Sequence, residues 1–378
     1  MAPRRDLRLD FFRGLALVCI FIDHIPENYL NYFTLSSIGF SDAAEVFIFI
    51  SGFTAALVYG RTLATRGILL ASVQVLRRAW QLYVAHIFLF VIFIAEVSYT
   101  VRTFNNPMYN EEMGVGDFLE HPHIAVVQAM LLQFQPTFLD ILPLYIVMLL
   151  IFPLVLACLR RHPSVALVPS ALIYLGVQVF SLDMPAYPPG NIWTFNPLAW
   201  QFLFVLGAAL GHGGPQSATG RRLLAAAYWP ALAIAAAAFA IRLSWTFHGF
   251  WEAIPPLFQR QLWPLNKSNL SPVRLISFFA MVMLAARWVS PQARFMRTAA
   301  ARPLVLCGRH SLEIFCLSIL LSALGHFLLS EINAGFTMQL GVNAVGIAVM
   351  CLTAGMLDWY RTAQRMPVTA AGVVGEGE

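Results

Sequence analysis

Charged residues are scarce in this sequence: Asp, Glu, Lys and Arg together make up 11% of the 378 residues. Soluble globular chains carry roughly 25% charged residues. This composition therefore excludes an ordinary soluble enzyme, a disordered protein and a nucleic-acid binder. Lysine is rarer still, because Lys267 is the single lysine among 24 basic residues. The net charge of +5 is carried by arginine.

Cysteine is also rare, with five residues that all lie inside or at the end of apolar runs. They show no CxxC spacing and have no nearby Cys or His partner, which excludes a zinc motif and a disulfide framework. His121 and His123 flank a proline without a third ligand close by. We expect no metal site and no tightly bound cofactor.

Apolar residues make up 59% of the chain, and the mean hydropathy is +0.69. Runs of about 20 apolar residues are long enough to cross a bilayer as helices. Residues 124–134 form a shorter run, which indicates an interfacial or re-entrant helix. The sequence predicts an all-α polytopic membrane protein with about ten transmembrane helices. The predicted spans are 12–31, 43–60, 78–98, 138–158, 165–182, 198–212, 223–243, 272–289, 304–329 and 338–357.

The arginines predict the orientation of these spans. With the N-terminus in the cytoplasm, 18 of the 24 basic residues fall in cytoplasmic segments, as the inward bias of Lys and Arg requires. Both termini are therefore expected inside. We expect one transmembrane domain over residues 1–365 and a disordered tail over 366–378. The first span lacks a small-residue cleavage site and is expected to be retained.

Ionisable residues at membrane depth are costly and each suggests a function. Arg13 and His24 are eleven residues apart, which places them on one helical stripe and ~16 Å apart along the axis. Glu27 is expected one turn beyond on nearly the same face, where it could polarise the His24 ring, whereas Asp23 points about 100° away. A neutral imidazole suits proton transfer at a hydroxyl. The alternatives are a snorkelling anchor for Arg13 and a buried structural role for His24.

Two further groups of residues are candidates. Glu45 enters the second span from the outer side, and Arg309 and Glu313 are spaced as an i,i+4 pair, which indicates either a structural ion pair or an anion site. The outer span ends combine carboxylate, amide and aromatic groups, which suit sugar hydroxyls and ring faces but are also ordinary at membrane interfaces. These outer residues are Asp140, Tyr145, Asn196, Trp200 and Gln201.

Several segments resemble a known family. RLDFFRGLALVCIFIDH (Arg8 to His24) and EVFIFISGF (Glu45 to Phe53) are similar to the first two helices of the membrane acyltransferase-3 superfamily. QPTFLDILPLYIV (Gln135 to Val147), FNPLAWQFLFVLG (Phe195 to Gly207) and GRHSLEIFCLSILLS (Gly308 to Ser322) resemble the OpgC family, which attaches succinyl groups to osmoregulated periplasmic glucans. The sequence departs from the superfamily in its ninth helix, where Leu312 follows Ser311 in place of the usual Tyr.

The resemblance implies a ten-helix acyltransferase of the bacterial inner membrane. It would take an acyl group from cytoplasmic acyl-CoA, with succinyl-CoA as co-substrate, and deliver it to a glucan or other saccharide outside. In this sequence, His24 corresponds to the superfamily's catalytic base and Arg13 to its arginine associated with the acyl donor. Glu45 corresponds to an acidic residue of the pocket. We further assign Asp23 and Glu27 to the catalytic group, and Arg77, Arg78 and Arg309 to the donor.

Two other functions fit the sequence. One is an O-acetyltransferase of another envelope polysaccharide, which nothing local distinguishes from a succinyltransferase. The other is a transporter or flippase with a buried relay of Arg, His and Glu. Transporters often carry inverted repeats, and the sequence shows no internal repeat, which disfavours this function.

Overall fold

The computed structural model describes residues 6–106, 108–213, 226–246, 251–252, 255–256, 259 and 265–364. Within these residues the regular structure is helical and contains no β-strand, which confirms the all-α prediction. The predicted disordered tail, 366–378, lies outside the described residues.

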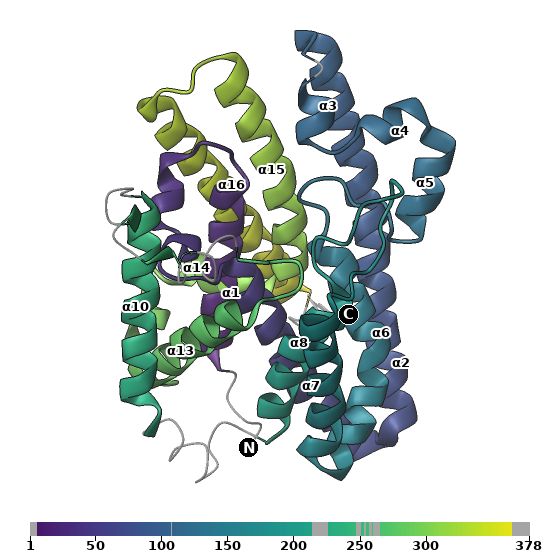
Figure 1. Cartoon of the computed structure of the whole chain (residues 1–378), viewed down its shortest axis with the longest axis vertical. Helices are drawn as coiled ribbons and strands as arrows, with labels where there is room; N and C mark the ends of the chain where they lie inside the picture. The colour runs from purple at the N-terminus through teal and green to yellow at the C-terminus, as the bar shows by residue number, and fades with distance from the viewer. Residues whose placement is uncertain are drawn as a thin grey trace, which may run out of the picture.

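The helices follow the apolar runs of the sequence (Figure 1). The longer ones are α1 (Leu7–Asp23), α2 (Ala43–Phe104), α6 (Ile141–Arg161), α7 (Pro163–Phe180), α8 (Pro197–Gly213), α10 (Tyr228–Thr246), α13 (Pro272–Trp288), α15 (Ser311–Glu331) and α16 (Phe336–Ala363). The shorter ones are η1 (Tyr29–Phe33), η2 (Leu35–Ser37), α3 (Met108–Glu112), α4 (Gly116–Glu120), α5 (Pro122–Met130), η3 (Arg294–Arg297) and α14 (Arg302–Arg309).

Six helices of the described chain are long and apolar enough to cross a membrane: α2, α6, α7, α10, α15 and α16. The 62-residue α2 contains two of the predicted spans, 43–60 and 78–98. Gly67 lies between these spans and interrupts the helix with φ 84° and ψ 173°. A positive φ of this kind is accessible to glycine without steric cost. The helices α1 and α13 have 17 residues each. The total of ten crossings stays a prediction.

The predicted span 304–329 is divided into two helices, α14 and α15, at His310. The predicted short helix near 124–134 appears as α5. The helix α1 ends at Asp23 and His24 caps it, so the helical stripe expected to run on to Glu27 stops one turn early.

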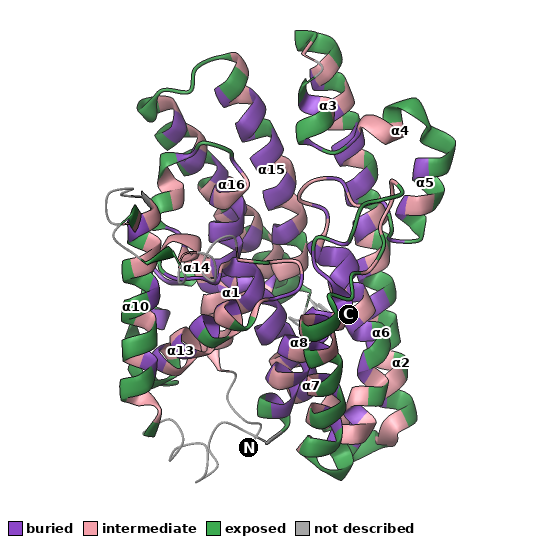
Figure 2. Ribbon diagram, in the orientation of Figure 1, coloured by how far each residue is buried: buried purple, intermediate pink, exposed green. Residues whose placement is uncertain are grey.

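The helix α1 lies in the middle of the molecule and is mostly buried (Figure 2). Gly14 of α1 and Gly308 of α14 allow these two helices to cross closely, since a Cβ at Gly14 would overlap the carbonyl oxygen of Leu304, and one at Gly308 that of Asp10. Small residues permit such close contacts between helices in membranes. The central position of α1 places Arg13 and His24 in the protein interior, away from lipid.

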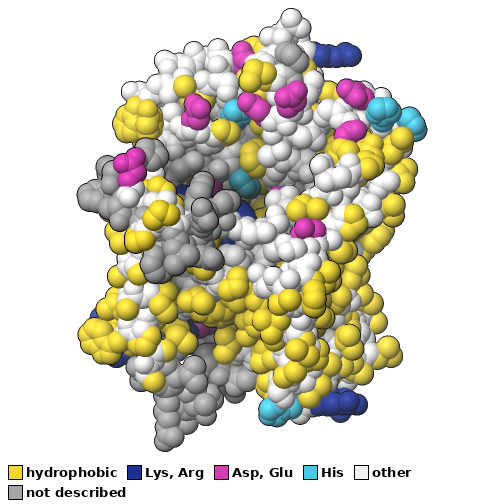
Figure 3. All heavy atoms as spheres, in the orientation of Figure 1, with side chains coloured by type: hydrophobic (Ala, Val, Ile, Leu, Met, Phe, Trp, Pro, Cys, Tyr) yellow, Lys and Arg dark blue, Asp and Glu magenta, His cyan; other side chains and the backbone are white. Residues whose placement is uncertain are grey.

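The outer helices expose apolar side chains instead. Leu172 and Phe180 of α7 and Met356 and Trp359 of α16 are exposed, and Figure 3 shows hydrophobic side chains spread around the lower part of the molecule, with acidic and histidine side chains at the end where α3, α4 and α5 lie. Apolar surface of this extent is expected where lipid replaces water. The chain is a membrane protein.

Candidate active site

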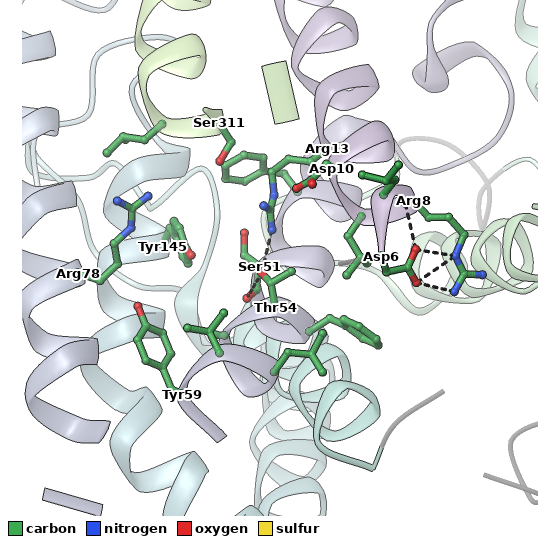
Figure 4. Close-up of a pocket in the computed structure, with 18 of the residues that line it drawn as sticks. Asp6, Arg8, Asp10, Arg13, Ser51, Thr54, Tyr59, Arg78, Tyr145 and Ser311 are labelled. Atoms are coloured by element: carbon green, nitrogen blue, oxygen red, sulfur yellow. Dashed lines mark hydrogen bonds and ion pairs between the residues drawn. The ribbon is translucent and has the colours of Figure 1, made fainter. Parts of the chain in front are cut away.

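A cavity of about 1270 Å³ opens beside the first turns of α1 and is lined by five arginines, of which Figure 4 labels Arg8, Arg13 and Arg78. The five are Arg8 and Arg13 from α1, Arg61 and Arg78 from α2, and Arg297 from η3. We call this space the arginine cavity. Its lining extends along α2 from Arg61 to Phe47, which are ~21 Å apart along a helix axis.

The arginines of the cavity differ in their contacts. Arg8 is bound by Asp6 at 2.7 Å, and Arg13 donates to the hydroxyl of Thr54 at 2.8 Å. In the part of the chain that the structure describes, the guanidinium groups of Arg61, Arg78 and Arg297 form no ion pair with a carboxylate. The cavity therefore has an excess of positive charge, which suits a ligand that carries several negative charges.

The other end of the cavity is apolar and approaches His24. Phe47, Leu142 and Phe315 line this end. Leu142 lies in the first turn of α6, four residues after Phe138 in the sequence. The ring of Phe138 stacks on the His24 ring, with centroids 4.4 Å apart and planes at 28°. His24 itself does not line the cavity among the described residues.

The imidazole of His24 is positioned by stacking on the Phe138 ring, and its Nδ1 makes no hydrogen bond within the described residues. This nitrogen is buried. Asp23 does not reach the ring, since its carboxylate accepts from the hydroxyls of Thr34 at 2.7 Å and Ser36 at 3.4 Å. A buried nitrogen without a partner is rare in proteins and suits a group that meets a ligand.

The prediction that Glu27 polarises His24 is wrong. Glu27 follows the end of α1, has φ 54° and is exposed. The helical spacing used for that prediction requires a continuous helix, and Pro26 follows shortly after α1 ends. Glu27 is therefore turned out of the stripe that contains Arg13.

Four charged residues form a partly buried group near the start of α2, which we call the outer charge cluster: Asp42, Glu45, Lys267 and Arg274. Arg274 donates from Nε to Glu45 at 2.8 Å and from a terminal nitrogen to Asp42 at 3.3 Å. Lys267 pairs with Asp42 at 2.8 Å. Glu45 also accepts from the backbone N–H of Asp42 at 2.9 Å, which completes a capping box at the start of α2.

The outer charge cluster is close to neutral, with two carboxylates and two cations. Burial alone would lower the pKa of Lys267, but the carboxylate of Asp42 raises it above its ordinary value. Lys267 also lies within electrostatic range of His24. In Figure 3, basic and histidine side chains are visible in a hollow near the middle of the face drawn.

The predicted pair of Arg309 and Glu313 is wrong, because α14 ends at Arg309 and a new helix begins at Ser311. Arg309 instead binds Asp358 of α16 at 2.8 Å, and Glu313 binds Arg361 at 2.6 Å. Of the arginines assigned to the donor, Arg13 and Arg78 line the cavity. Arg77 is exposed, and neither it nor Arg309 is among the cavity residues.

Three of the residues assigned to the acceptor form buried contacts within the protein. Trp200 is fully buried and donates to the carbonyls of Lys267 and Ser268, and Gln201 is buried against Ser170. Asn196 bonds Asn269 and Leu182. These three side chains hold the loop around Lys267 and the helices α7 and α8 in place.

Of the remaining two acceptor candidates, Asp140 occupies the N-cap position of α6 without a capping hydrogen bond from its side chain, and it is half-buried. Tyr145 lines the arginine cavity, on the side expected for the donor. Sequence reasoning missed Arg61 and Arg297 in the cavity and Phe138 against His24. Of the outer charge cluster, the sequence analysis named Glu45 as a candidate and noted Lys267 as the single lysine.

The sequence was compared with known families and proteins. Residues 5–362 match the OpgC protein family, which covers nearly the whole chain. The chain belongs to the OpgC family. Membership in the OpgC family implies a membrane acyltransferase of the glucan succinyltransferase type. No curated protein and no solved structure matches the chain.

Proposed function

We propose that this OpgC-family protein is an O-acyltransferase of the bacterial inner membrane. It transfers a succinyl group from coenzyme A, bound in the arginine cavity, to a hydroxyl of a periplasmic glucan. The observation that carries the proposal is the cavity itself, which is lined by five arginines and by an apolar group that includes Leu142. Leu142 follows by four residues Phe138, whose ring stacks on His24.

The proposal requires that the arginine end of the cavity faces the cytoplasm. Ten crossings meet this requirement when α1, the two arms of α2, and α6, α7, α8, α10, α13, α15 and α16 each cross once. Both termini then lie inside, and most arginines fall on the same side, in agreement with the inward bias of basic residues. The outer charge cluster and the α10–α13 segment then face the periplasm.

The chemistry of coenzyme A matches the cavity. Its phosphates are polyanionic, and arginine guanidinium groups bind phosphate oxygens with paired, charge-assisted hydrogen bonds. Arg61, Arg78 and Arg297 are available for this, with Arg13 further in. The apolar end formed by Phe47, Leu142 and Phe315 would receive the thioester end of the pantetheine arm.

His24 would act as the base. A ring nitrogen takes the proton of a glucan hydroxyl while that oxygen forms a bond to the thioester carbonyl carbon. The carbon–sulfur bond then breaks, and the proton passes from His24 to the departing thiolate. The products are a glucan ester and free coenzyme A. Holding both substrates at one imidazole supplies much of the acceleration by proximity.

The test is the substitution His24→Ala in cells that make periplasmic glucans, read by mass spectrometry of the glucans. We expect the succinyl mass increment to disappear while the protein stays in the membrane fraction. His123→Ala is the matched control, because His123 is an exposed histidine in α5 and its loss should leave the increment unchanged. Fully succinylated glucan from the His24→Ala strain would reject the proposal.

A further inference from the structure

The donor proposed above ends in a carboxylate, which lies two methylene groups beyond the reacting carbonyl. An enzyme that selects this donor needs a cation near His24 whose charge is not already neutralised. A neutral acyl chain of the same length would leave that cation without its partner, and this difference is the physical basis of selectivity. The inference below rests on the proposed function.

Several cations on the outer side and near the site are already neutralised. Arg274 is bound by Glu45 and Asp42, and Lys267 is bound by Asp42. Arg309 is bound by Asp358 and belongs to α14, on the same side as the arginine cavity. Each would have to give up a carboxylate before it could bind another, which makes all three weak candidates.

Arg242 of α10 differs from these three. Its Nε donates to the backbone carbonyl of Ser36 at 2.9 Å, and its guanidinium lies 5.1 Å from the ring centroid of Trp245. These contacts fix the orientation of the group without cancelling its charge. Within the described residues no carboxylate hydrogen-bonds Arg242, so the edge formed by its two terminal nitrogens is available for a bidentate contact.

The loop that holds Arg242 also holds the end of α1. Ser36 accepts from Arg242 through its carbonyl, and the hydroxyls of Ser36 and Thr34 donate to Asp23, the residue before His24. Asp23 lies within electrostatic range of Arg242, although its carboxylate is occupied by the two hydroxyls. The loop 34–36 therefore links the half-buried guanidinium to the backbone that positions the imidazole.

We propose that Arg242 binds the terminal carboxylate of the dicarboxylic acyl donor and thereby selects succinyl over neutral acyl groups. The guanidinium meets this carboxylate with its two terminal nitrogens while the thioester carbonyl lies at His24. Arg242 is a specificity-determining residue and takes no part in proton transfer.

The experiment measures kcat/KM of the purified full chain with glucan as acceptor and with two donors, succinyl-CoA and butyryl-CoA. Butyryl has the same chain length as succinyl, with a methyl group in place of the carboxylate. We expect the wild-type protein to prefer succinyl-CoA, and Arg242→Gln to lower the ratio of the two kcat/KM values by about 10- to 100-fold, as the loss of a charge-assisted hydrogen-bonded pair predicts. Arg102→Gln, at an exposed arginine in the last turn of α2, should keep the wild-type ratio.

Other outcomes separate this inference from the proposed function. An equal loss with both donors would show that Arg242 supports the fold only and would overturn the inference, as would an unchanged ratio. A wild-type protein that uses both donors equally well would also overturn it, while leaving the acyltransferase in place. A wild-type protein that transfers neither group would instead reject the proposed function.

Discussion

The arginine cavity and the outer charge cluster use basic residues in opposite ways. In the cavity, Arg61, Arg78 and Arg297 have no carboxylate partner within the described chain. In the outer charge cluster, Arg274 contacts two carboxylates and is nearly buried, with 10% of its side chain exposed. The first arrangement leaves positive charge for a ligand, whereas the second uses positive charge to neutralise buried acids.

This difference separates binding from stability. A cation that already has a buried partner is costly to remove, because the partner is left as an isolated charge. Removing a cation from an open cavity changes the free energy of unfolding little, but the ligand that binds there loses a contact. Substitutions in the two groups should therefore affect different measurements.

The largest effect on stability is expected from Arg274→Leu. This change leaves Glu45, which is fully buried, without its cation and should cost about 3–5 kcal/mol. The measurement is thermal unfolding of the detergent-solubilised protein, together with its yield from membranes. We expect a marked fall in both.

The second variant, Arg274→Leu with Glu45→Gln, tests the cause. Glutamine is neutral and can still accept from the backbone N–H of Asp42 in the capping box, while Lys267 continues to balance Asp42. Most of the lost stability should return. A double variant as unstable as Arg274→Leu alone would show that packing, and not an isolated charge, accounts for the loss.

The arginine cavity should respond in the opposite manner. Arg78→Gln removes one cation from the cavity lining and should raise KM for the acyl-CoA donor by about 10- to 100-fold, the size expected for a charge-assisted contact to phosphate. The unfolding temperature should change little. Steady-state kinetics over a range of donor concentrations, paired with thermal unfolding, would measure both quantities.

The neighbouring residue supplies the control. Arg77 is exposed and lies outside the cavity lining, so Arg77→Gln removes the same charge one position away and should leave KM near its wild-type value. If both variants raised KM equally, the effect would come from the general positive field of this end of the protein. Contact with the ligand would then not be needed to explain it.

Much of the fold was predictable from the sequence, because apolar runs of spanning length have few alternatives to helices in a bilayer. The predicted spans 138–158 and 165–182 lie within three residues of the bounds of α6 and α7. Periodicity could not show where a helix stops inside an apolar run. The break at His310 and the end of α1 at Asp23 come from the local backbone and tertiary contacts. Because of the first break Glu313 does not pair with Arg309, and because of the second Glu27 does not continue the helical stripe of Arg13 and His24.

The site was less predictable, since it depends on contacts between distant segments. Helical spacing related Arg13 to His24 within one helix, but nothing local indicated that Glu45 would meet Arg274, which lies 229 positions away. Residue type was also a poor guide to exposure. Trp200 and Asn196 have side chains suited to sugars, yet both are buried and hydrogen-bonded to the loop around Lys267.

The smallest effect is expected at Lys267, which shares a carboxylate with Arg274 but has 42% of its side chain exposed. A partly solvated ion pair contributes about 0–1 kcal/mol, so Lys267→Gln should shift the unfolding temperature only slightly. The pKa of Lys267 is raised in the folded protein. Its contribution is therefore complete below the unfolded pKa of about 10.4 and is lost as the pH rises through the folded value.

A scan of unfolding temperature against pH, from about 9 to about 11.5, would measure this contribution as the difference between wild-type protein and Lys267→Gln. The difference should shrink at the alkaline end, while Lys267→Arg should keep its stability because arginine stays protonated there. If Lys267→Gln lowered the unfolding temperature as much as Arg274→Leu does, this expectation would be wrong. That result would show that exposure does not separate the two cations, and that Asp42 depends on both of them.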